Sequence, residues 1–415
     1  MEIPEGWHVS RLDELPSSNS RPVTKLGPFG SAIKKSDYTS EGYKVYGQQQ
    51  VLSGDESFGD YWVGQEKYDQ LSACAVLPGD ILLSTMGTPG YVLRLSSNSL
   101  AGIINPRLMR ISVCHDIANP LFLELHLKSD LAQRQFFGFR QGGTMPAING
   151  KSVNSIKVLL PPLLEQHRIA EILGTWDRAI AVTEALIAKS EAQKKALMQQ
   201  LLTGKRRLAG FEREWKEVRL DEIFQFKKGK GISKKAVVED GLIPCVLYGE
   251  LYTHYGDVVR TVKSKTNSNE GIPSVVGDVL IPASTTTTGI DLANATAVLE
   301  GGIRLGGDIN ILRPLDANTE SRFIARLLTY AETFKLAKRA QGSTIVHLYG
   351  NHLKDIVVSV PGHAEQVAIS DAIDLSEQPI QALQAKLQTL KTEKSALMQQ
   401  LLTGKRRVKL TEVAA

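Results

Sequence analysis

A twelve-residue segment that occurs twice is the strongest constraint on the fold of this chain. ALMQQLLTGKRR fills residues 196–207 and again residues 396–407, an offset of 200 residues. The match extends backwards at the same offset, because QGGT at 141–144 corresponds to QGST at 341–344. A period of this length is too long for a solenoid repeat. The sequence therefore predicts two copies of one unit, each long enough to form its own core.

The N-terminal part of each unit matches with an offset that drifts. VSRLDEL at 9–15 resembles EVRLDEI at 217–223, and LPGDILLSTMGTPG at 77–90 resembles VVGDVLIPASTTTTG at 275–289. VYGQQQV at 45–51 resembles LYGELYT at 247–253, which aligns Tyr46 with Tyr248. A drifting offset indicates insertions and deletions, which concentrate in loops. We interpret each unit as a variable globular part followed by a constant C-terminal part.

The constant part has the pattern of a long helix. Apolar side chains recur at alternating spacings of four and three residues, which is the seam of a coiled coil. Prolines precede the two patterns at 161–162 and 361, and Thr-Gly follows at 203–204 and 403–404. The first helix should span about 38 residues, or roughly 57 Å. The residues expected on these helices, as seam or partner-docking residues, are Glu165, Gln166, Ile169, Leu173, Trp176, Ile180, Ile187, Leu197, Leu201, Glu365, Gln366, Ile369, Ile373, Ile380, Leu383, Leu387, Leu390, Leu397 and Leu401.

Two arrangements fit two such helices. Either they form a hairpin that packs on its own core, or they pair antiparallel and hold two globular domains apart. Seams of matched length favour the second arrangement. A pseudo-twofold relation then makes GKRRV at 404–408 equivalent to GKRRL at 204–208, the link that leads to Trp215, so the chain end should lie near Trp7 in a near-circular arrangement. Pro379 interrupts the second pattern and should kink or restart that helix.

The variable parts have the pattern of mixed α/β (α+β) domains. Short apolar runs such as DILLS at 80–84 and DVLIP at 278–282 alternate with Gly-rich turns. The expected fold is two such domains in tandem, separated by two long antiparallel coiled-coil helices. The expected organisation is a globular domain at 1–160, a helical region at 161–207, a second globular domain at 208–360, a second helical region at 361–408 and a tail at 409–415.

Composition indicates the compartment and excludes several kinds of chemistry. There is no long apolar run or secretory pattern, and the three cysteines are widely spaced, so we expect a cytoplasmic protein without disulfides. The eight histidines are scattered, without metal-ligand spacing. The sequence lacks a methyltransferase tetrapeptide, a phosphate-binding Gly-rich loop and a nuclease cluster of carboxylates. We therefore predict no catalytic residue, no metal and no bound cofactor.

Polar and basic loops remain, in equivalent parts of the two copies. A formal net charge of +5 permits binding to a polyanion. Lys and Arg can neutralise phosphates, and Gln, Ser, Thr and Arg can read base edges, although any one such residue is more often simply solvated. The candidate DNA-binding residues are Lys34, Lys35, Tyr46, Gln48, Gln49, Gln50, Thr85, Arg107, Arg140, Lys227, Lys228, Lys230, Lys234, Lys235, Tyr248, Ser284, Thr285, Thr286, Arg304, Lys338 and Arg339.

Over nearly its whole length, the chain resembles the DNA specificity subunits of Type I restriction-modification enzymes. The resemblance rests on GPFGS and KKSDY within 27–38, the Gly-Asp pairs at 79–80 and 277–278, the GGT and GST turns, PPLLEQHRIAEIL at 161–173 with its copy PGHAEQVAISDAI at 361–373, and the two LLTGKRR tails. It implies that each globular domain is a target recognition domain that reads one half of an asymmetric, split site in double-stranded DNA. It also implies a non-catalytic chain whose helices set the gap between the half-sites.

The resemblance further implies partners. Each helical region would dock one modification subunit, which transfers a methyl group from S-adenosylmethionine to adenine. Restriction subunits, which are motor-nucleases that use ATP and Mg²⁺, would join to cleave unmodified DNA. Two identical partners would explain two near-identical constant parts on one chain, and two different half-sites would explain two different readers.

Two other classes of function are compatible with the pattern. One is a single-chain DNA methyltransferase or nuclease with duplicated recognition domains, against which the missing catalytic motifs argue. The other is a structural adaptor that joins proteins through its coiled coil without reading DNA. Sequence-specific DNA recognition in the presence of partners separates the resemblance from the adaptor, and activity of the purified chain alone would indicate the enzyme.

Overall fold

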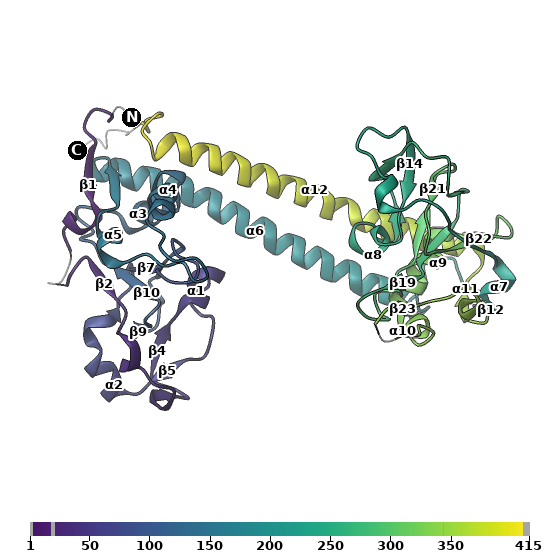
Figure 1. The fold of residues 1–415 in the computed structure, drawn as a ribbon, viewed down its shortest axis with the longest axis horizontal. Helices are drawn as coiled ribbons and strands as arrows, with labels where there is room; N and C mark the ends of the chain where they lie inside the picture. The colour runs from purple at the N-terminus through teal and green to yellow at the C-terminus, as the bar shows by residue number, and fades with distance from the viewer. Residues whose placement is uncertain (1–2, 18–20, 343, 410–415) are drawn as a thin grey trace. The chain divides into compact units, whose positions relative to one another are not determined.

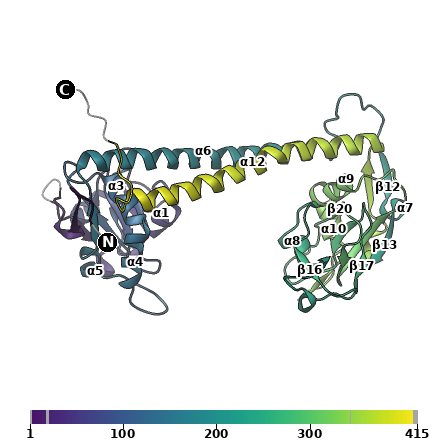
Figure 2. The same cartoon turned by 90° about the horizontal axis from the view of Figure 1, so that it is seen from above.

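The computed structural model describes residues 3–17, 21–342 and 344–409, and the chain divides into two compact units. Unit 1 contains Met1–Glu184 and Lys386–Ala415, and unit 2 contains Ala185–Ala385. Each unit holds one globular domain, called domain 1 (residues 3–160) and domain 2 (residues 208–360), with one half of each of two long helices (Figures 1 and 2). The helical regions are thus divided between the two units.

Both long helices are unbroken. α6 (Leu163–Leu201) and α12 (His363–Leu401) contain 39 residues each, which corresponds to roughly 58 Å. The second helix does not restart at Pro379, which was one of the two expected effects, because α12 continues through this residue. A proline lacks the backbone donor that would bond to the carbonyl four residues earlier. That carbonyl belongs to Leu375, which is 64% exposed, so water can take the place of the missing donor.

The helix ends are embedded in the domain cores. In unit 1, Ile169 near the start of α6 and Leu401 at the end of α12 belong to the core of domain 1. In unit 2, Leu201 at the end of α6 and Ile369 near the start of α12 belong to the core of domain 2. The seam residues that are only half-buried are Trp176, Ile180, Ile187, Leu197, Leu383, Leu387, Leu390 and Leu397.

Part of the set predicted for the seam and for docking is buried, as a seam requires, and offers no surface to a partner. A side chain that is already covered by the rest of the chain cannot also be covered by a partner. The predicted docking residues that are buried in this way are Glu165, Gln166, Ile169, Leu173, Leu201, Glu365, Gln366, Ile369, Ile373, Ile380 and Leu401.

The two helices run antiparallel within each unit, and both units use the same ion pair. In unit 1, Lys394 Nζ of α12 lies 2.5 Å from Asp177 Oδ1 of α6. In unit 2, Lys194 of α6 pairs with Glu377 of α12. These pairs are related by the offset of 200 residues, since Lys194 corresponds to Lys394 and Asp177 to Glu377.

The end of the described chain packs against its beginning, as the sequence predicts. Trp7 Nε1 donates to Glu165 Oε2 at 3.0 Å, and Arg407 Nη2 reaches the same carboxylate at 2.8 Å. The Arg407 guanidinium lies over the Trp7 ring, 5.7 Å from its centroid. Unit 2 repeats the arrangement, because Arg207 bonds to Glu365 and lies 5.9 Å from the centroid of the Trp215 ring.

Domain 1 is built on two sheets and a short strand pair. One sheet has the order β2-β10-β7-β8 and is antiparallel throughout; the other has the order β3-β5-β4-β9-β6, in which β4 and β9 are parallel. β1 pairs with β11 next to the start of α6. The elements are β1 (His8–Arg11), β2 (Thr24–Leu26), β3 (Tyr38–Thr39), β4 (Tyr43–Tyr46), α1 (Gln48–Ser53), β5 (Trp62–Val63), α2 (Gln65–Gln70), β6 (Ala75–Val76), β7 (Ile81–Ser84), β8 (Val92–Arg94), β9 (Gly102–Ile104), β10 (Leu108–Ile111), α3 (Pro120–Lys128), α4 (Asp130–Gly138), α5 (Gly150–Asn154) and β11 (Lys157–Leu160).

Domain 2 repeats this plan. One sheet has the order β13-β22-β18-β20-β15, the other β16-β14-β21-β17, and β12 pairs with β24 as β1 pairs with β11. A further pair, β19 with β23, has only isolated bridges as its counterpart in domain 1. The elements are β12 (Lys216–Arg219), α7 (Leu220–Ile223), β13 (Phe224–Lys228), β14 (Ile243–Val246), α8 (Glu250–Thr253), β15 (Val258–Val259), β16 (Ser264–Thr266), β17 (Ile272–Pro273), β18 (Val279–Pro282), β19 (Ser284–Thr285), β20 (Thr296–Val298), β21 (Arg304–Leu305), β22 (Ile309–Pro314), α9 (Ser321–Arg326), a π-helical turn (Leu327–Ala331), α10 (Thr333–Ala337), β23 (Val346–His347), α11 (Gly350–Leu353) and β24 (Val357–Val360).

Shared hydrogen bonds establish which positions of the two domains correspond. Asp80 accepts from the Leu77 amide, and Asp278 accepts from the Val275 amide, each at 2.8 Å. The predicted match of the two Gly-Asp turns is therefore confirmed.

The predicted match of Tyr46 with Tyr248 is wrong. The Gln50 side chain accepts from the amide three residues earlier at 2.9 Å, and the Glu250 side chain does the same at 2.9 Å. The correct offset is therefore 200, which places Tyr248 opposite Gln48. The two segments share one Tyr-Gly dipeptide, and aligning them on it shifts the correspondence by two residues.

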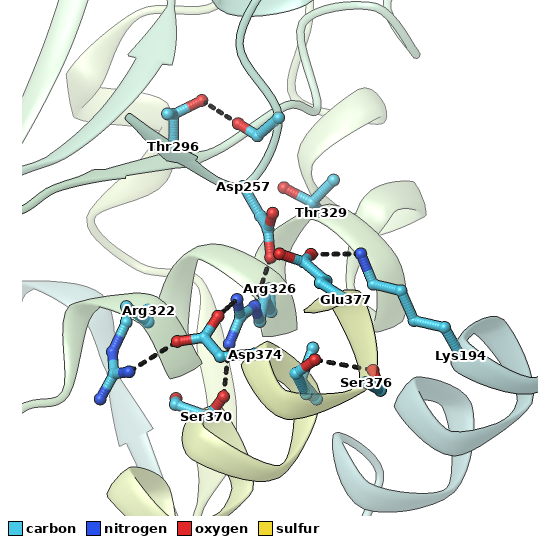
Figure 3. Close-up of polar contacts among 12 residues, drawn as sticks. Lys194, Asp257, Thr296, Arg322, Arg326, Thr329, Ser370, Asp374, Ser376 and Glu377 are labelled. Carbon is cyan, nitrogen blue, oxygen red and sulfur yellow. Dashed lines mark hydrogen bonds and ion pairs between the residues drawn. The ribbon is translucent and has the colours of Figure 1, made fainter. Parts of the chain in front are cut away.

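A buried ion cluster fastens domain 2 to α12 (Figure 3). The guanidinium of Arg326, from α9, is fully buried and contacts Asp257, while its Nη2 lies 2.5 Å from Asp374 Oδ1 on α12. Arg322 and Arg260 also contact the Asp374 carboxylate, at 2.7 and 2.8 Å. Burial acts to raise the pKa of Asp374, but the hydrogen bonds and charges of these arginines lower it to about 2.

At the corresponding place in unit 1, domain 1 packs against α6 without an ion cluster among the described residues. The amides of Asn119 and Glu320 bond to Gln166 and Gln366 in the same way, at 2.9 and 3.0 Å, which aligns α3 with α9 at an offset of 201 residues. At that offset Leu125 stands where domain 2 has Arg326. The long helix carries Gly174 where α12 has Asp374. Apolar packing therefore replaces the ion cluster in unit 1.

The ion cluster predicts a pH-dependent contribution to the stability of unit 2. The folded-state pKa of Asp374 is depressed, so its contribution is complete above the unfolded value near 3.8 and disappears as the pH falls toward about 2. We expect Asp374→Asn to destabilise unit 2 by about 2 kcal/mol at neutral pH, with a difference from wild type that shrinks over this acid range. Urea denaturation followed by hydrogen exchange in domain 2 measures both effects.

Asp371→Asn is the matched control, because Asp371 is exposed and, among the described residues, Arg322 is its one ionic partner. It should leave the stability of unit 2 nearly unchanged. A loss of stability in Asp374→Asn that does not vary with pH would contradict the electrostatic explanation.

Candidate nucleic-acid interface

A polar hollow of about 440 Å³ opens on the surface of domain 1. It lies where the chain leaves β4, enters α1 and passes the turn between β9 and β10. Three glutamines, one asparagine, one arginine and two tyrosines line it, together with Val45, Leu52 and Gly47. The lining residues are Tyr38, Val45, Gly47, Gln48, Gln49, Gln50, Leu52, Tyr61, Asn105 and Arg107.

Gln48 presents only an acceptor to this hollow. Its Nε2 donates to the Met86 carbonyl at 2.5 Å and to the Ser84 and Thr88 hydroxyls at 2.9 and 2.8 Å. Because a carbonyl oxygen can only accept, these contacts fix which way the amide points. Among the described residues, none donates to Gln48 Oε1. The amide oxygen therefore remains available to a ligand in the hollow.

Arg107 supplies the donors on the other side of the hollow. Its backbone amide bonds to Asn105 Oδ1 at 3.0 Å, which closes the turn between β9 and β10. Its side chain is exposed, and within the described parts of the chain it has no hydrogen-bond or ionic partner. A hollow with a fixed acceptor and a free guanidinium can pair with the edges of bases, which carry both donors and acceptors.

Three residues of domain 1 that the sequence predicts to contact DNA are buried inside the domain. Tyr46 is buried and donates to the Leu100 carbonyl at 2.8 Å, and burial raises its pKa to about 12. Gln50 is buried, with its amide bonded to the Gly47 amide and the Phe58 carbonyl. Thr85 is buried and donates to the Arg107 carbonyl at 3.0 Å. The prediction that these three side chains contact DNA is wrong, because their polar atoms are already paired.

The other predicted residues of domain 1 lie on its surface. Lys34 and Lys35 are exposed in the loop before Tyr38, which lines the hollow. Gln49 is exposed at the start of α1. Arg140 is exposed, stacks on Phe137 with 5.2 Å between guanidinium and ring centroid, and bonds to the Pro89 carbonyl at 3.1 Å. Three lining residues, Tyr38, Tyr61 and Asn105, were missed by sequence reasoning, although Asn105 lies in the same turn as Arg107.

Domain 2 presents different side chains on the same scaffold. Tyr248 is exposed at the position of Gln48, at the N-terminal side of α8. Lys228, Lys230, Lys234, Lys235, Thr286, Lys338 and Arg339 are exposed, whereas Lys227 and Arg304 are half-buried. Arg339 pairs with Asp355 at 3.1 Å. Ser284 and Thr285 are buried in β19, so the prediction that they contact DNA is wrong.

The part of the chain that the structure describes has no group of three or more His, Cys, Asp or Glu side chains placed to hold a metal ion. Within the same residues, no helix is both long and apolar enough to cross a bilayer.

Comparison with known proteins points to one family. Residues 4–192 and residues 212–392 each match the family model of the Type I restriction modification DNA specificity domain. The chain is 23% identical, over 445 aligned residues, to the Type I restriction enzyme MjaVIII specificity subunit of Methanocaldococcus jannaschii, covering 99% of this chain and 95% of that one.

Solved structures share the fold. The S subunit of a Type-I restriction-modification system from M. genitalium aligns with a TM-score of 0.59 at 17% identity, over 99% of both chains. A chain from a study of complex assembly and conformational transition in the type I R-M system aligns with a TM-score of 0.60 at 20% identity, over 98% of this chain and 100% of that one. Because the family model matches twice and covers most of the sequence, this chain belongs to the Type I restriction modification DNA specificity domain family.

Proposed function

We propose that this chain selects the DNA site of a type I restriction-modification complex, with each domain reading one half of a two-part site. One observation supports this most strongly. Two copies of a DNA specificity domain share a scaffold, and yet they present different side chains at the same place, Gln48 in domain 1 and Tyr248 in domain 2. Two domains with the same scaffold but different exposed side chains can each recognise a different half-site.

The chemistry of the domain 1 hollow indicates what it reads. Gln48 Oε1 is an acceptor, so it suits the exocyclic amino group of adenine or cytosine in the major groove. The usual bidentate pairing of glutamine with adenine also needs the side-chain amino group, which is occupied here by Met86. Arg107 can donate two bonds to guanine O6 and N7. We infer a half-site in which an amino-bearing base lies close to a guanine.

We infer that the long helices set the unread gap between the half-sites. Each helix has 39 residues, or roughly 58 Å, which lies between one and two turns of B-DNA at about 34 Å each. Two readers on such a spacer leave base pairs between them unread. The antiparallel ion pairs in both units support a spacer of two helices.

The partners that we propose are two modification subunits that methylate adenine, with restriction subunits as further members. S-adenosylmethionine, ATP and Mg²⁺ would bind to those subunits, and this chain would be non-catalytic. In place of the buried seam, we propose docking at the exposed residues that are identical in the two repeats. We select Gln200, Lys205 and Arg206, with Gln400, Lys405 and Arg406, from among these residues.

Base reading predicts a change confined to one half-site. In the complex with its partners, Gln48→Ala should relax discrimination by about 10-fold at one base pair of one half-site, since one specific contact contributes on the order of 1–3 kcal/mol. Tyr248→Ala should change only the other half-site. Mapping of methylated adenines across the host genome reports both motifs. If either variant alters both halves, or neither alters any base, the assignment of one reader to each half fails.

The spacer predicts a change in the gap alone. Adding seven residues, or about two helical turns, to α6 after Ala185 and to α12 after Ala385 should lengthen the unread gap and leave the bases of both half-sites as they are. The methylation map of the lengthened protein gives the gap directly. An unchanged gap in a complex that still assembles would contradict the spacer.

The docking surfaces predict a change in stoichiometry. Lys405→Glu combined with Arg406→Glu should reduce the modification subunits per chain from two to one, because only one of the two equal surfaces is altered. Native mass spectrometry counts the subunits. Lys189→Glu, an exposed charge reversal in the middle of α6, is the control and should retain both subunits. Two subunits on the double variant would show that docking occurs elsewhere.

A further inference from the structure

Beside the variable side chains, each domain carries a glycine-containing hairpin that has Gln, Gly and Thr at the same three positions in the two copies. We call residues 141–147 and the described residues of the corresponding segment, 341–342 and 344–347, the glycine hairpins. The amide of Gln141 donates to the Ala147 carbonyl at 2.9 Å, and the reverse bond is 2.8 Å. Gln341 and His347 exchange the same two bonds, at 2.8 and 2.7 Å. The same pair of backbone hydrogen bonds therefore closes the hairpin in both domains.

The backbone conformation explains why both hairpins have glycine at the same position. Gly142 has a φ of +90°, and a Cβ there would lie 3.0 Å from the Met145 carbonyl oxygen. Gly342 has a φ of +123°, and a Cβ there would lie 2.1 Å from the Ile345 carbonyl oxygen. Only glycine combines this left-handed conformation with so close an approach.

The fold does not explain the identity of the polar side chains. Gln141 and Gln341 are identical and exposed, and so are Thr144 and Thr344. Within the described residues, none of these four side chains has a hydrogen-bond partner. Surface positions of this kind are free to diverge, as the residues at the base-reading hollow have done. A common ligand at both hairpins would account for their agreement.

The hairpins adjoin the variable surfaces. In domain 1, the Gly87 amide donates to the Pro146 carbonyl at 2.8 Å, so this hairpin packs on the loop that Gln48 holds through Met86 and Thr88. In domain 2, the hairpin is fixed through the pairing of β23 with β19. Whatever lies in the hollow therefore passes close to the domain 1 hairpin.

We propose that the two glycine hairpins hold the sugar–phosphate backbone of DNA, one at each half-site, without reading sequence. This rests on the function proposed above. The backbone is the part of DNA that stays the same when the bases differ. Gln and Thr side chains donate to phosphate oxygens, and Arg140 or Lys338 beside each hairpin supplies positive charge.

A docked protein fits these hairpins less well. A specific protein interface has an apolar centre built from many side chains. Each hairpin offers one exposed apolar side chain, Met145 at 59% and Ile345 at 48% exposure, among polar neighbours. Single apolar side chains of this kind suit contact with the sugar rings that flank a phosphate.

The test uses the complete complex with its partners. The variants are Gln141→Ala with Thr144→Ala, and Gln341→Ala with Thr344→Ala. Affinity is measured by titration at several salt concentrations, for a duplex with the motif of the wild-type complex and for an unrelated duplex of the same length. We expect affinity for both duplexes to fall together by about 10-fold at every salt concentration, with the salt dependence of wild type because the removed side chains are uncharged, while the methylated motif and the subunit stoichiometry stay as in wild type.

Three results would overturn the proposal. Loss of a partner subunit would assign the hairpins to protein docking, a changed motif would assign them to base reading, and unchanged affinity would leave them without a role in DNA binding. Gln193→Ala and Gln388→Ala, exposed glutamines of the long helices, are the matched controls and should retain wild-type affinity. Failure of the proposed function itself is distinguishable, because the wild-type complex would then have no two-part motif.

Discussion

The fold depends on long helices whose two ends lie in different hydrophobic cores. α6 contributes Ile169 to the core of domain 1 and Leu201 to the core of domain 2, and α12 contributes Ile369 and Leu401 in the opposite order. Each helix is thereby buried at both ends, while its middle is only half-buried. Neither domain core is complete without both helices, since each draws apolar side chains from one end of each. The two constant segments match in length, with 39 residues in each long helix.

The polar contacts at the helix ends follow the same duplication. Glu165 and Glu365 are buried carboxylates, and each is paired with an arginine from the end of the other repeat segment in its unit. Each arginine also lies over a tryptophan at the beginning of its domain. A buried carboxylate without such a partner would be strongly destabilising. The verbatim tail GKRR is therefore explained in part by its own packing, which leaves Lys205, Arg206 and their copies as the solvent-facing remainder.

Much of this could be predicted from the sequence, because helical periodicity and internal repetition are local signals. The ends of both long helices and the position of the chain end near Trp7 follow from them, whereas the continuity of α12 through Pro379 does not. The buried Thr85, Ser284 and Thr285 could not be identified in the same way. Their polar atoms are covered by segments tens of residues distant, so the sequence alone cannot separate a polar side chain of a strand from one of a surface loop.

The residue-by-residue correspondence between the two domains also could not be predicted from the sequence. A shared Tyr-Gly dipeptide suggested that Tyr46 and Tyr248 correspond, whereas the capping bonds of Gln50 and Glu250 fix the true register two residues away. Glutamine and glutamate perform the same backbone function there, and only the contacts reveal the equivalence. The fixed amide of Gln48 is likewise visible only in the structure, since its three acceptors lie in a loop more than 30 residues along the chain.

The central claim is that each domain reads its own half of a two-part DNA site. The most direct measurement exchanges residues 1–160 for the corresponding domain of another family member, expresses the chimera with the modification subunits and maps methylated bases across the genome. The account predicts a split motif in which one half and its position relative to the gap change together, while the other half is retained. A motif that changes in both halves, or an intact complex that methylates no two-part motif, would contradict it.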